Sequence, residues 1–214
     1  MKMDAATTAV IVLSVFLLLW YIIGHLYNRR HGLRLFQWLE QGLATGGNEY
    51  QWRWLGSPAS GARILVYQAC PPFRRIDITL LLENREIPLL WLAERLQKKR
   101  DAVIIQATLH SPGSDEIQAG WPSELRSPTI LSWARETGPY GLIVAYRGPG
   151  TTSLRTQMTS WLTRYGKYLR RFALRREDPH LVLWIHLNGL AFRLPASVFF
   201  TDLQAALEVR EAER

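Results

Sequence analysis

The feature that most constrains this chain is a long apolar run near its start. Between Ala5 and Leu26 there is no Asp, Glu, Lys or Arg, and twelve of the residues from Val10 to Leu26 are Val, Ile, Leu or Phe. Because about 20 consecutive apolar residues suffice to cross a bilayer as a helix, the run predicts a single transmembrane helix. A buried core helix fits less well, since the run is apolar on every face.

The flanks of the run favour a retained anchor over a cleaved signal peptide. The run is longer than the usual apolar region of a signal peptide, no Ala-x-Ala site follows it, and the flank HLYNRRHGLR is typical of a stop-transfer sequence. The arginines after the run predict, by the positive-inside rule, an outside N-terminus and a cytoplasmic C-terminal part. The residues expected at the membrane interface are Trp20, Tyr21, Tyr27, Arg29, Arg30 and Arg34.

Three segments are predicted along the chain. Residues 1–27 form the anchor, residues 28–47 a juxtamembrane helix and link, and residues 48–214 a cytoplasmic domain. Within that domain, residues 110–128 are rich in Pro, Gly and Ser and are a candidate joint between subdomains. Cys70 is the sole cysteine, which excludes an intramolecular disulfide and agrees with a reducing compartment.

Hydrophobic periodicity predicts an α+β fold, with an antiparallel or mixed sheet and helices packed mainly on one face. Short connections between the first strands predict an antiparallel meander. Strands are expected at 49–55, 62–69, 74–82, 102–109, 141–147 and 181–187, with a short one near 116–119. Helices are expected at 33–43, from Pro88 to about Arg100, at 153–173 and at about 197–210. Leu89, Leu92 and Leu96 are expected to be the buried stripe of the Pro88 helix.

Basic residues concentrated between 155 and 176 form the candidate binding surface of the domain. The helix expected at 153–173 has an apolar stripe that would pack on the sheet, and no acidic residue precedes Glu177 on its remaining surface. The chain carries a net charge of +8 at pH 7, so a tethered domain of this kind favours anionic lipid headgroups or an acidic patch on a partner. A merely solvated basic face is the alternative. The candidate residues are Arg155, Arg164, Lys167, Arg170, Arg171, Arg175 and Arg176.

Signatures of catalysis, cofactors and metals are weak. The turn at 148–153 lies between a predicted strand and helix but lacks the lysine and the spacing of a P-loop, so Thr152 or Ser153 is interpreted as a helix N-cap. No histidine lies at a metal-ligand spacing from another ligand. Cys70 is interpreted as a packed side chain. We therefore expect no cofactor and no metal.

Three hypotheses for the function follow from these features. The first is a single-pass membrane-anchored interaction or scaffold protein that binds anionic lipid and a protein partner at the cytoplasmic face. The second is a membrane-tethered enzyme with a noncanonical site, either near His110, Asp115 and Glu116 or at the 148–153 turn. The third is a membrane-tethered nucleic-acid binder, against which the lack of a recognised nucleic-acid module argues. We favour the first, because the anchor and the basic composition are the clearest features.

Overall fold

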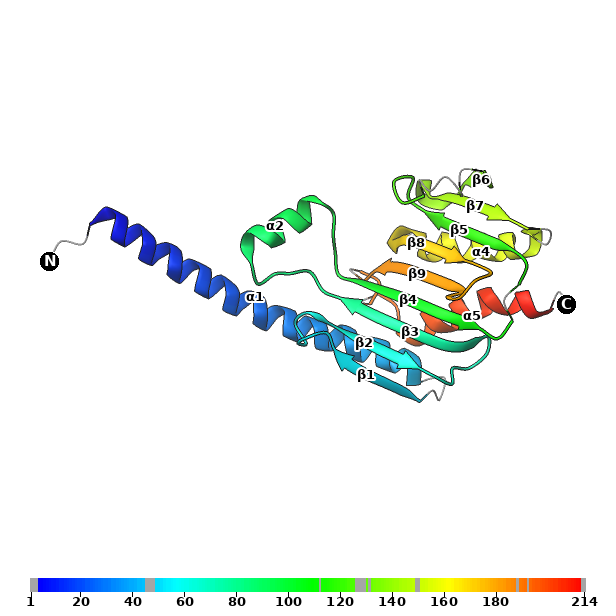
Figure 1. Ribbon diagram of the computed structural model, residues 1–214, viewed down its shortest axis with the longest axis horizontal. Helices are drawn as coiled ribbons and strands as arrows, with labels where there is room; N and C mark the ends of the chain where they lie inside the picture. The colour runs from blue at the N-terminus through cyan, green and yellow to red at the C-terminus, as the bar shows by residue number, and fades with distance from the viewer. Residues whose placement is uncertain are drawn as a thin grey trace.

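The structure is a computed structural model that describes residues 4–44, 49–111, 113–125, 130, 132–148, 151–187, 189–191 and 193–212. One long helix, α1 (Ala5–Ala44), runs beneath a nine-stranded sheet and extends well beyond it (Figure 1). The strand order is β1-β2-β3-β4-β9-β8-β5-β7-β6, and all neighbouring strands are antiparallel. The fold is therefore α+β, as the periodicity predicts.

The element boundaries agree with most of the sequence predictions. The strands are β1 (Tyr50–Trp54), β2 (Gly61–Val66), β3 (Phe73–Leu81), β4 (Ala102–Leu109), β5 (Glu116–Gly120), β6 (Ala134–Thr137), β7 (Ile143–Arg147), β8 (Leu169–Leu174) and β9 (Leu181–His186). The other helices are α2 (Pro88–Leu96), α4 (Thr151–Tyr165) and α5 (Ala196–Ala212), with short 3-10 turns at Pro139–Gly141 (η1) and Gly166–Tyr168 (η2). Strands β1 to β4 form the predicted meander.

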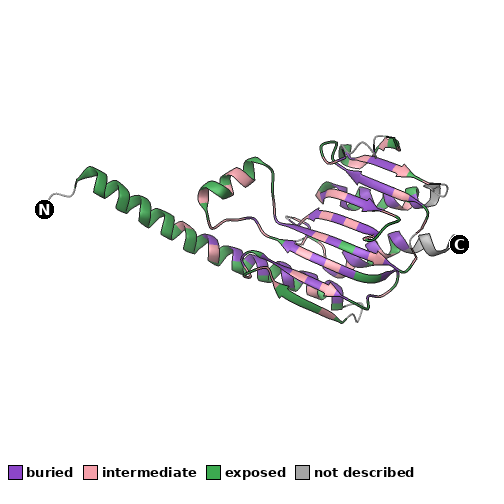
Figure 2. Cartoon of the chain, viewed as in Figure 1, coloured by how far each residue is buried: buried purple, intermediate pink, exposed green. Residues whose placement is uncertain are grey.

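The core lies between the sheet and the helices α1, α4 and α5. Ile64, Ile78 and Ile105 lie side by side across β2, β3 and β4 and are fully buried on this face. Apolar and polar residues alternate in β1, and its apolar residues lie on the same face of the sheet. Trp52 and Trp54 contact the ring of Phe36 in α1, at 4.8 and 5.2 Å between centroids. Figure 2 shows buried residues along the central strands and along the inner ends of these helices.

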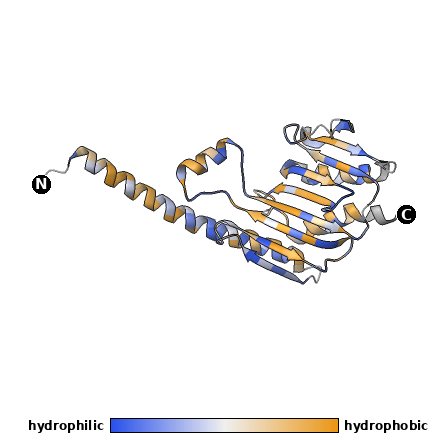
Figure 3. Ribbon diagram, in the orientation of Figure 1, coloured by the Kyte–Doolittle hydropathy of each residue, from blue (hydrophilic) through white to orange (hydrophobic). Residues whose placement is uncertain are grey.

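Helix α1 has two halves with opposite surroundings. Residues 5–19, which we call its exposed half, are all solvent-exposed (Figure 2) and are mostly apolar (Figure 3). Near the other end, Leu35, Leu39 and Leu43 are buried in the core. By length and composition, α1 is long and apolar enough to span a membrane. The helix is continuous through residues 28–34, so the expected link is itself helical there.

The helix predicted at 153–173 is wrong in its second part. Helix α4 ends at Tyr165, and after η2 the chain continues as strand β8. Leu169 and Phe172 suit a helical stripe, but both are buried in the sheet, where they face Ile185 and Leu183 of β9. The spacing of three residues between them fits a strand because the register shifts between Leu169 and Arg171, which adds one residue to β8.

The predicted burial of the Pro88 helix is also wrong. Helix α2 forms where expected, but Leu89, Leu92 and Leu96 are 80, 51 and 77% exposed. The helix stands apart from the sheet and lies beside α1, near the exposed half of α1 (Figure 1). Its apolar stripe is therefore largely exposed to solvent.

Candidate functional site

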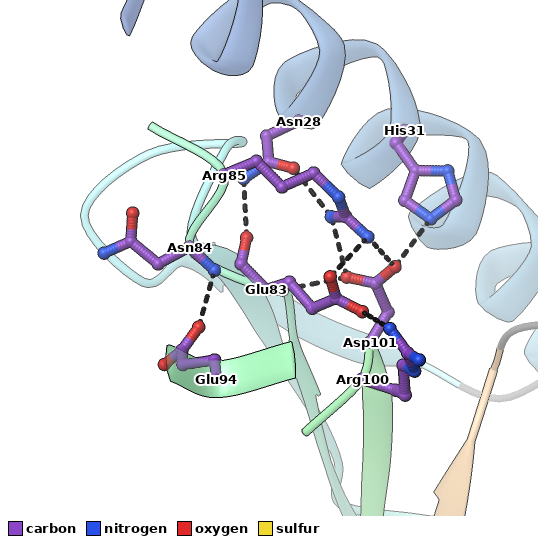
Figure 4. A network of polar contacts seen from close by, with 8 residues as sticks. All are labelled: Asn28, His31, Glu83, Asn84, Arg85, Glu94, Arg100 and Asp101. Carbon is purple, nitrogen blue, oxygen red and sulfur yellow. Dashed lines mark hydrogen bonds and ion pairs between the residues drawn. The ribbon is translucent and has the colours of Figure 1, made fainter. Parts of the chain in front are cut away.

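Polar and charged side chains from three segments form a buried network where α1 meets the domain (Figure 4). Asn28 and His31 belong to α1, Glu83 and Arg85 to the segment after β3, and Asp101 directly precedes β4. The guanidinium of Arg85 donates to both oxygens of Asp101, at 3.0 and 2.7 Å, and to Asn28 Oδ1 at 2.8 Å. His31 Nε2 lies 3.1 Å from Asp101 Oδ2, and the Glu83 amide donates to Asp101 Oδ1 at 2.8 Å.

These contacts hold Asp101 in its ionised form. Burial by itself would raise the pKa of Asp101, but hydrogen bonds with His31, with Arg85 and with the Glu83 amide lower it from 3.8 to about 2. Burial is the largest influence on Arg85 and would lower its pKa, but Asp101, Glu83 and Tyr27 together outweigh burial and raise it. The pair is therefore charged at neutral pH, and the loss of either partner would leave an uncompensated charge in the interior.

Glu83 adds a second carboxylate with looser contacts. Its side chain is buried, 3.4 Å from Arg85 Nη2 and 3.7 Å from Arg100 Nη1. Neither of its oxygens has a hydrogen-bond partner within the described part of the chain, and the same holds for Arg100 Nη1. The network thus places two carboxylates opposite two guanidinium groups, a balance that lets charged groups remain buried at the base of α1.

The segment around Arg85 also holds α1 closely. Trp20 Nε1 donates to the Arg85 carbonyl at 3.1 Å, and His25 Nδ1 lies 2.9 Å from Glu86 Oε1. Gly24 permits this approach, because a Cβ atom there would lie 2.2 Å from the Arg85 carbonyl oxygen. The rings of Trp20 and Trp91, whose centroids are 5.8 Å apart, then join α1 to α2. Helix α1 is consequently packed against the domain along one side from Trp20 onward.

A cleft opens between α1 and α2, beside this network. A cavity of about 720 Å³ contains four arginines and no acidic residue in its lining, which consists of Ile23, Leu26, Tyr27, Arg30, His31, Arg34, Arg85, Arg95 and Gly189. A cavity of about 420 Å³ adjoins it on the side of the exposed half of α1 and is lined by Trp20, Ile23, Gly24, Tyr27, Arg85, Trp91 and Arg95. The two cavities share four lining residues, and together we call them the interface cleft.

The four arginines of the interface cleft differ in their ion pairs among the residues that the structure describes. Arg30, Arg34 and Arg95 form no ion pair within the described residues, whereas Arg85 is paired with Asp101. Arg95 lies over the ring of Trp91, at 4.9 Å from its centroid. Arg30 and Arg34 are one helical turn apart on α1, so both can reach the same group. Ile23, Tyr27, Arg30 and Arg34 are three or four residues apart, and this spacing in the sequence indicates that they share one face of α1.

The structure brings together four of the six residues that the sequence assigns to the membrane interface. Trp20, Tyr27, Arg30 and Arg34 all line the interface cleft. Tyr21 and Arg29 are exposed on other sides of α1, where Tyr21 stacks on His25 at 6.0 Å between ring centroids. Sequence reasoning missed Arg85 and Arg95, because their place in the cleft depends on how the segment between β3 and β4 folds against α1.

The basic residues between 155 and 176 come from several elements, and the single basic surface expected of them stays a prediction. They are divided among α4, η2, β8 and the segment after β8, which lie toward the other end of the molecule from the exposed half of α1 (Figure 1). Three are ion-paired, and these pairs are Arg155 with Glu136, Arg164 with Asp202, and Arg170 with Glu124. Arg171 is partly buried, and burial together with Arg175 lowers its pKa. Lys167 and Arg176 are exposed.

The residues of the enzyme hypothesis are only partly brought together. His110 is exposed, while Asp115 is buried against Gly148, where a Cβ atom would lie 2.0 Å from Asp115 Oδ1. Pro149, Gly150 and the side chains at 151–153 lie outside the description, so the expected N-cap at Thr152 or Ser153 does too. Neither cavity of the interface cleft includes any of these residues.

The remaining candidate ligands have structural surroundings. His180 is buried, and its Nδ1 accepts a hydrogen bond of 3.0 Å from the Leu109 amide. Cys70 is partly buried. Among the residues that the structure describes, no group of three or more His, Cys, Asp or Glu side chains is arranged to hold a metal ion.

Comparison with known proteins adds no family to this picture. No protein-family model matches the sequence, and no curated protein shows significant similarity to it. The function is therefore argued from the geometry of the chain itself.

Proposed function

We propose that this protein is a single-pass membrane-anchored interaction protein, whose domain lies in the cytoplasm against the inner leaflet. One observation carries the proposal. Within a single continuous helix, residues 5–19 are apolar and exposed while the far end is buried in the domain core. Exposed apolar surface costs about 25 cal/mol per Å² in water, and a bilayer removes that cost.

The exposed leucines of α2 support a second contact with the membrane. Leu89, Leu92 and Leu96 form an apolar stripe, and Lys98 and Lys99 come just after the helix, beyond its C-cap Gln97. An amphipathic helix with basic residues beside its apolar face is typical of segments that lie in the membrane interface. Helix α2 contacts α1 at Trp20, which directly follows the exposed half of α1. Both helices would therefore meet the same leaflet.

The arginines of α1 support the orientation. Arg29, Arg30 and Arg34 follow the apolar run, and only Lys2 and Asp4 carry charge before it. Anionic lipids of the cytoplasmic leaflet attract each nearby arginine by about 1 kcal/mol. The domain would then turn β8 and α4 away from the bilayer, toward a protein partner in the cytoplasm.

Protease treatment of vesicles that contain the full chain tests this placement. We expect the domain to be digested in inverted vesicles and protected in right-side-out vesicles, with α1 resistant in both. Digestion in right-side-out vesicles would reverse the orientation. Release of the intact protein by alkaline extraction would overturn the anchor itself.

A further inference from the structure

We infer that the interface cleft binds one anionic phospholipid of the cytoplasmic leaflet, with its phosphate among Arg30, Arg34 and Arg95 and its apolar part along Trp20, Ile23 and Trp91. The inference rests on the proposed function, because a lipid reaches the cleft only if α1 spans the membrane. It goes further by assigning a specific site and a ligand class.

The positive charge of the interface cleft favours an anionic ligand. Its larger cavity is lined by four arginines and a histidine, without a carboxylate, and three of those arginines have no ion pair within the described residues. Guanidinium groups present several N–H donors in a planar array that suits phosphate oxygens. The volume of about 720 Å³ is in the range of small-molecule sites.

The polarity of the cleft changes along α1 in the same order as the polarity of a lipid. Nearest the exposed half of α1, the α1 residues that line the smaller cavity are Trp20, Ile23, Gly24 and Tyr27, without a charged group, and Arg85, Trp91 and Arg95 line it from the facing segment. About two to four helical turns further along α1, the larger cavity is lined by Arg30 and Arg34. Acyl chains in the bilayer and a phosphate at its surface follow this order, whereas a free phosphate ion would use only the arginines.

The groups around the arginines are held in place before any ligand binds. Arg85 lines both cavities of the cleft and is fixed by Asp101 and Asn28. Arg95 is positioned over Trp91, and Tyr27 stacks on His31 at 5.7 Å between ring centroids. A site whose parts are already ordered loses less conformational entropy when a ligand binds.

Lipid retention by the purified full chain tests the site. The protein is incubated in mixed micelles with phosphatidylglycerol or phosphatidylcholine, and bound lipid is counted by native mass spectrometry. We expect one phosphatidylglycerol per chain and no retained phosphatidylcholine. The double variant Arg30→Gln/Arg34→Gln should bind phosphatidylglycerol at least about tenfold more weakly, because it removes two charged donors to the phosphate.

The control variant Arg53→Gln/Arg74→Gln loses the same number of charges at exposed positions of β1 and β3, outside the cleft. It should bind phosphatidylglycerol as the parent chain does. Equal weakening in both double variants would show that only the overall charge matters and would overturn the site. Partial recovery of binding in Arg30→Lys/Arg34→Lys, with an unchanged circular dichroism spectrum, would exclude loss of folding as the cause.

Two further arms distinguish a bound lipid from a bound phosphate ion and test the anchor separately. Competition by millimolar inorganic phosphate that displaces the phosphatidylglycerol completely would identify a free-phosphate site and overturn the lipid assignment.

Reconstitution of every variant into phosphatidylcholine vesicles tests the anchor independently. Incorporation of all variants together with loss of binding only in Arg30→Gln/Arg34→Gln supports both proposals. Failure of the parent chain to incorporate would overturn the membrane placement, and the lipid site with it.

Discussion

At the scale of single residues, Asp101 is the centre of the junction between helix and domain. Its carboxylate contacts His31 from α1, and Arg85 and the Glu83 amide from the segment after β3. It is fully buried, so each of these contacts replaces water that the carboxylate has lost. The position of α1 relative to the sheet therefore depends on a charged group and on its exact partners.

Removal of that charge should destabilise the protein strongly. In Asp101→Asn the guanidinium of Arg85 would remain buried without its main counter-charge, which costs about 3 to 5 kcal/mol. The measurement is the free energy of unfolding of the full chain in detergent. Asp77→Asn is the matched control, because Asp77 pairs with the more exposed Arg63, and a pair of that kind contributes about 1 kcal/mol or less. Similar losses in the two variants would contradict the role of Asp101.

The same residue predicts a dependence on pH. Since folding lowers the pKa of Asp101 from 3.8 to about 2, the stabilisation is complete above pH 4 and is lost as the pH falls toward and below 2. The shift corresponds to about 2 kcal/mol. The difference in free energy of unfolding between the parent chain and Asp101→Asn should therefore shrink by an amount of this order as the solution is acidified. A difference that stays constant from pH 6 to pH 2 would contradict the assignment.

At the scale of elements, α2 is the helix whose surroundings the sequence misrepresents. The period of its leucines correctly predicts a helix with one apolar face, and Pro88 begins it at a position where the missing N–H costs nothing. An apolar face indicates that a surface is removed from water, but it does not indicate whether protein or lipid covers that surface. In a chain with a membrane anchor, the bilayer is a second apolar phase that competes with the protein core.

Spin labels at single cysteines in a Cys70→Ser background test the surroundings of α2. Labels at positions 18 and 96 should be accessible to oxygen in lipid, while a label at position 106, exposed on the open face of the sheet, should be accessible to a water-soluble nickel complex. A label at 96 that only the nickel complex reaches would place α2 in water. A label at 96 that neither reagent reaches would indicate a protein partner on α2 instead of lipid.

At the scale of the whole molecule, the sheet lies between two ends to which we assign different roles. The exposed half of α1 and the leucines of α2 lie at one end, and β8 and α4 lie toward the other (Figure 1). The sheet is continuous through β5, which lies within residues 110–128 and pairs with both β7 and β8. The division of the chain into the three predicted segments stays a prediction.

This arrangement predicts where a protein partner would bind. Lys167→Glu/Arg176→Glu reverses two exposed charges at the end away from α2, and it should reduce the recovery of an acidic partner several-fold. Affinity purification in mild detergent with quantitative mass spectrometry measures this. Arg53→Glu/Arg74→Glu carries the same change at exposed positions in β1 and β3. Recovery that is unchanged in the first variant, or reduced equally in both, would contradict binding at this end.

The sequence alone determined the elements with a strong local signal. The uncharged run predicts the exposed half of α1, and the alternation in β1 and β3 predicts the meander, because burial of one face imposes a period of two on a strand. At β8 the same reasoning failed. Leu169 and Phe172 have a spacing that suits a helix, and only pairing with β9, with its shift in register, decides that they belong to the sheet.

Only the tertiary structure decided the contents of the interface cleft and of the network beneath it. His31 and Asp101 are 70 positions apart in the chain, and Trp20 and Arg85 are 65 apart. Local periodicity states which side of each element avoids water, but it carries no information about which distant segment will cover that side. The cleft exists because the segment between β3 and β4 folds against α1, and this depends on a glycine, a buried ion pair and a tryptophan contact that act together only in the folded chain.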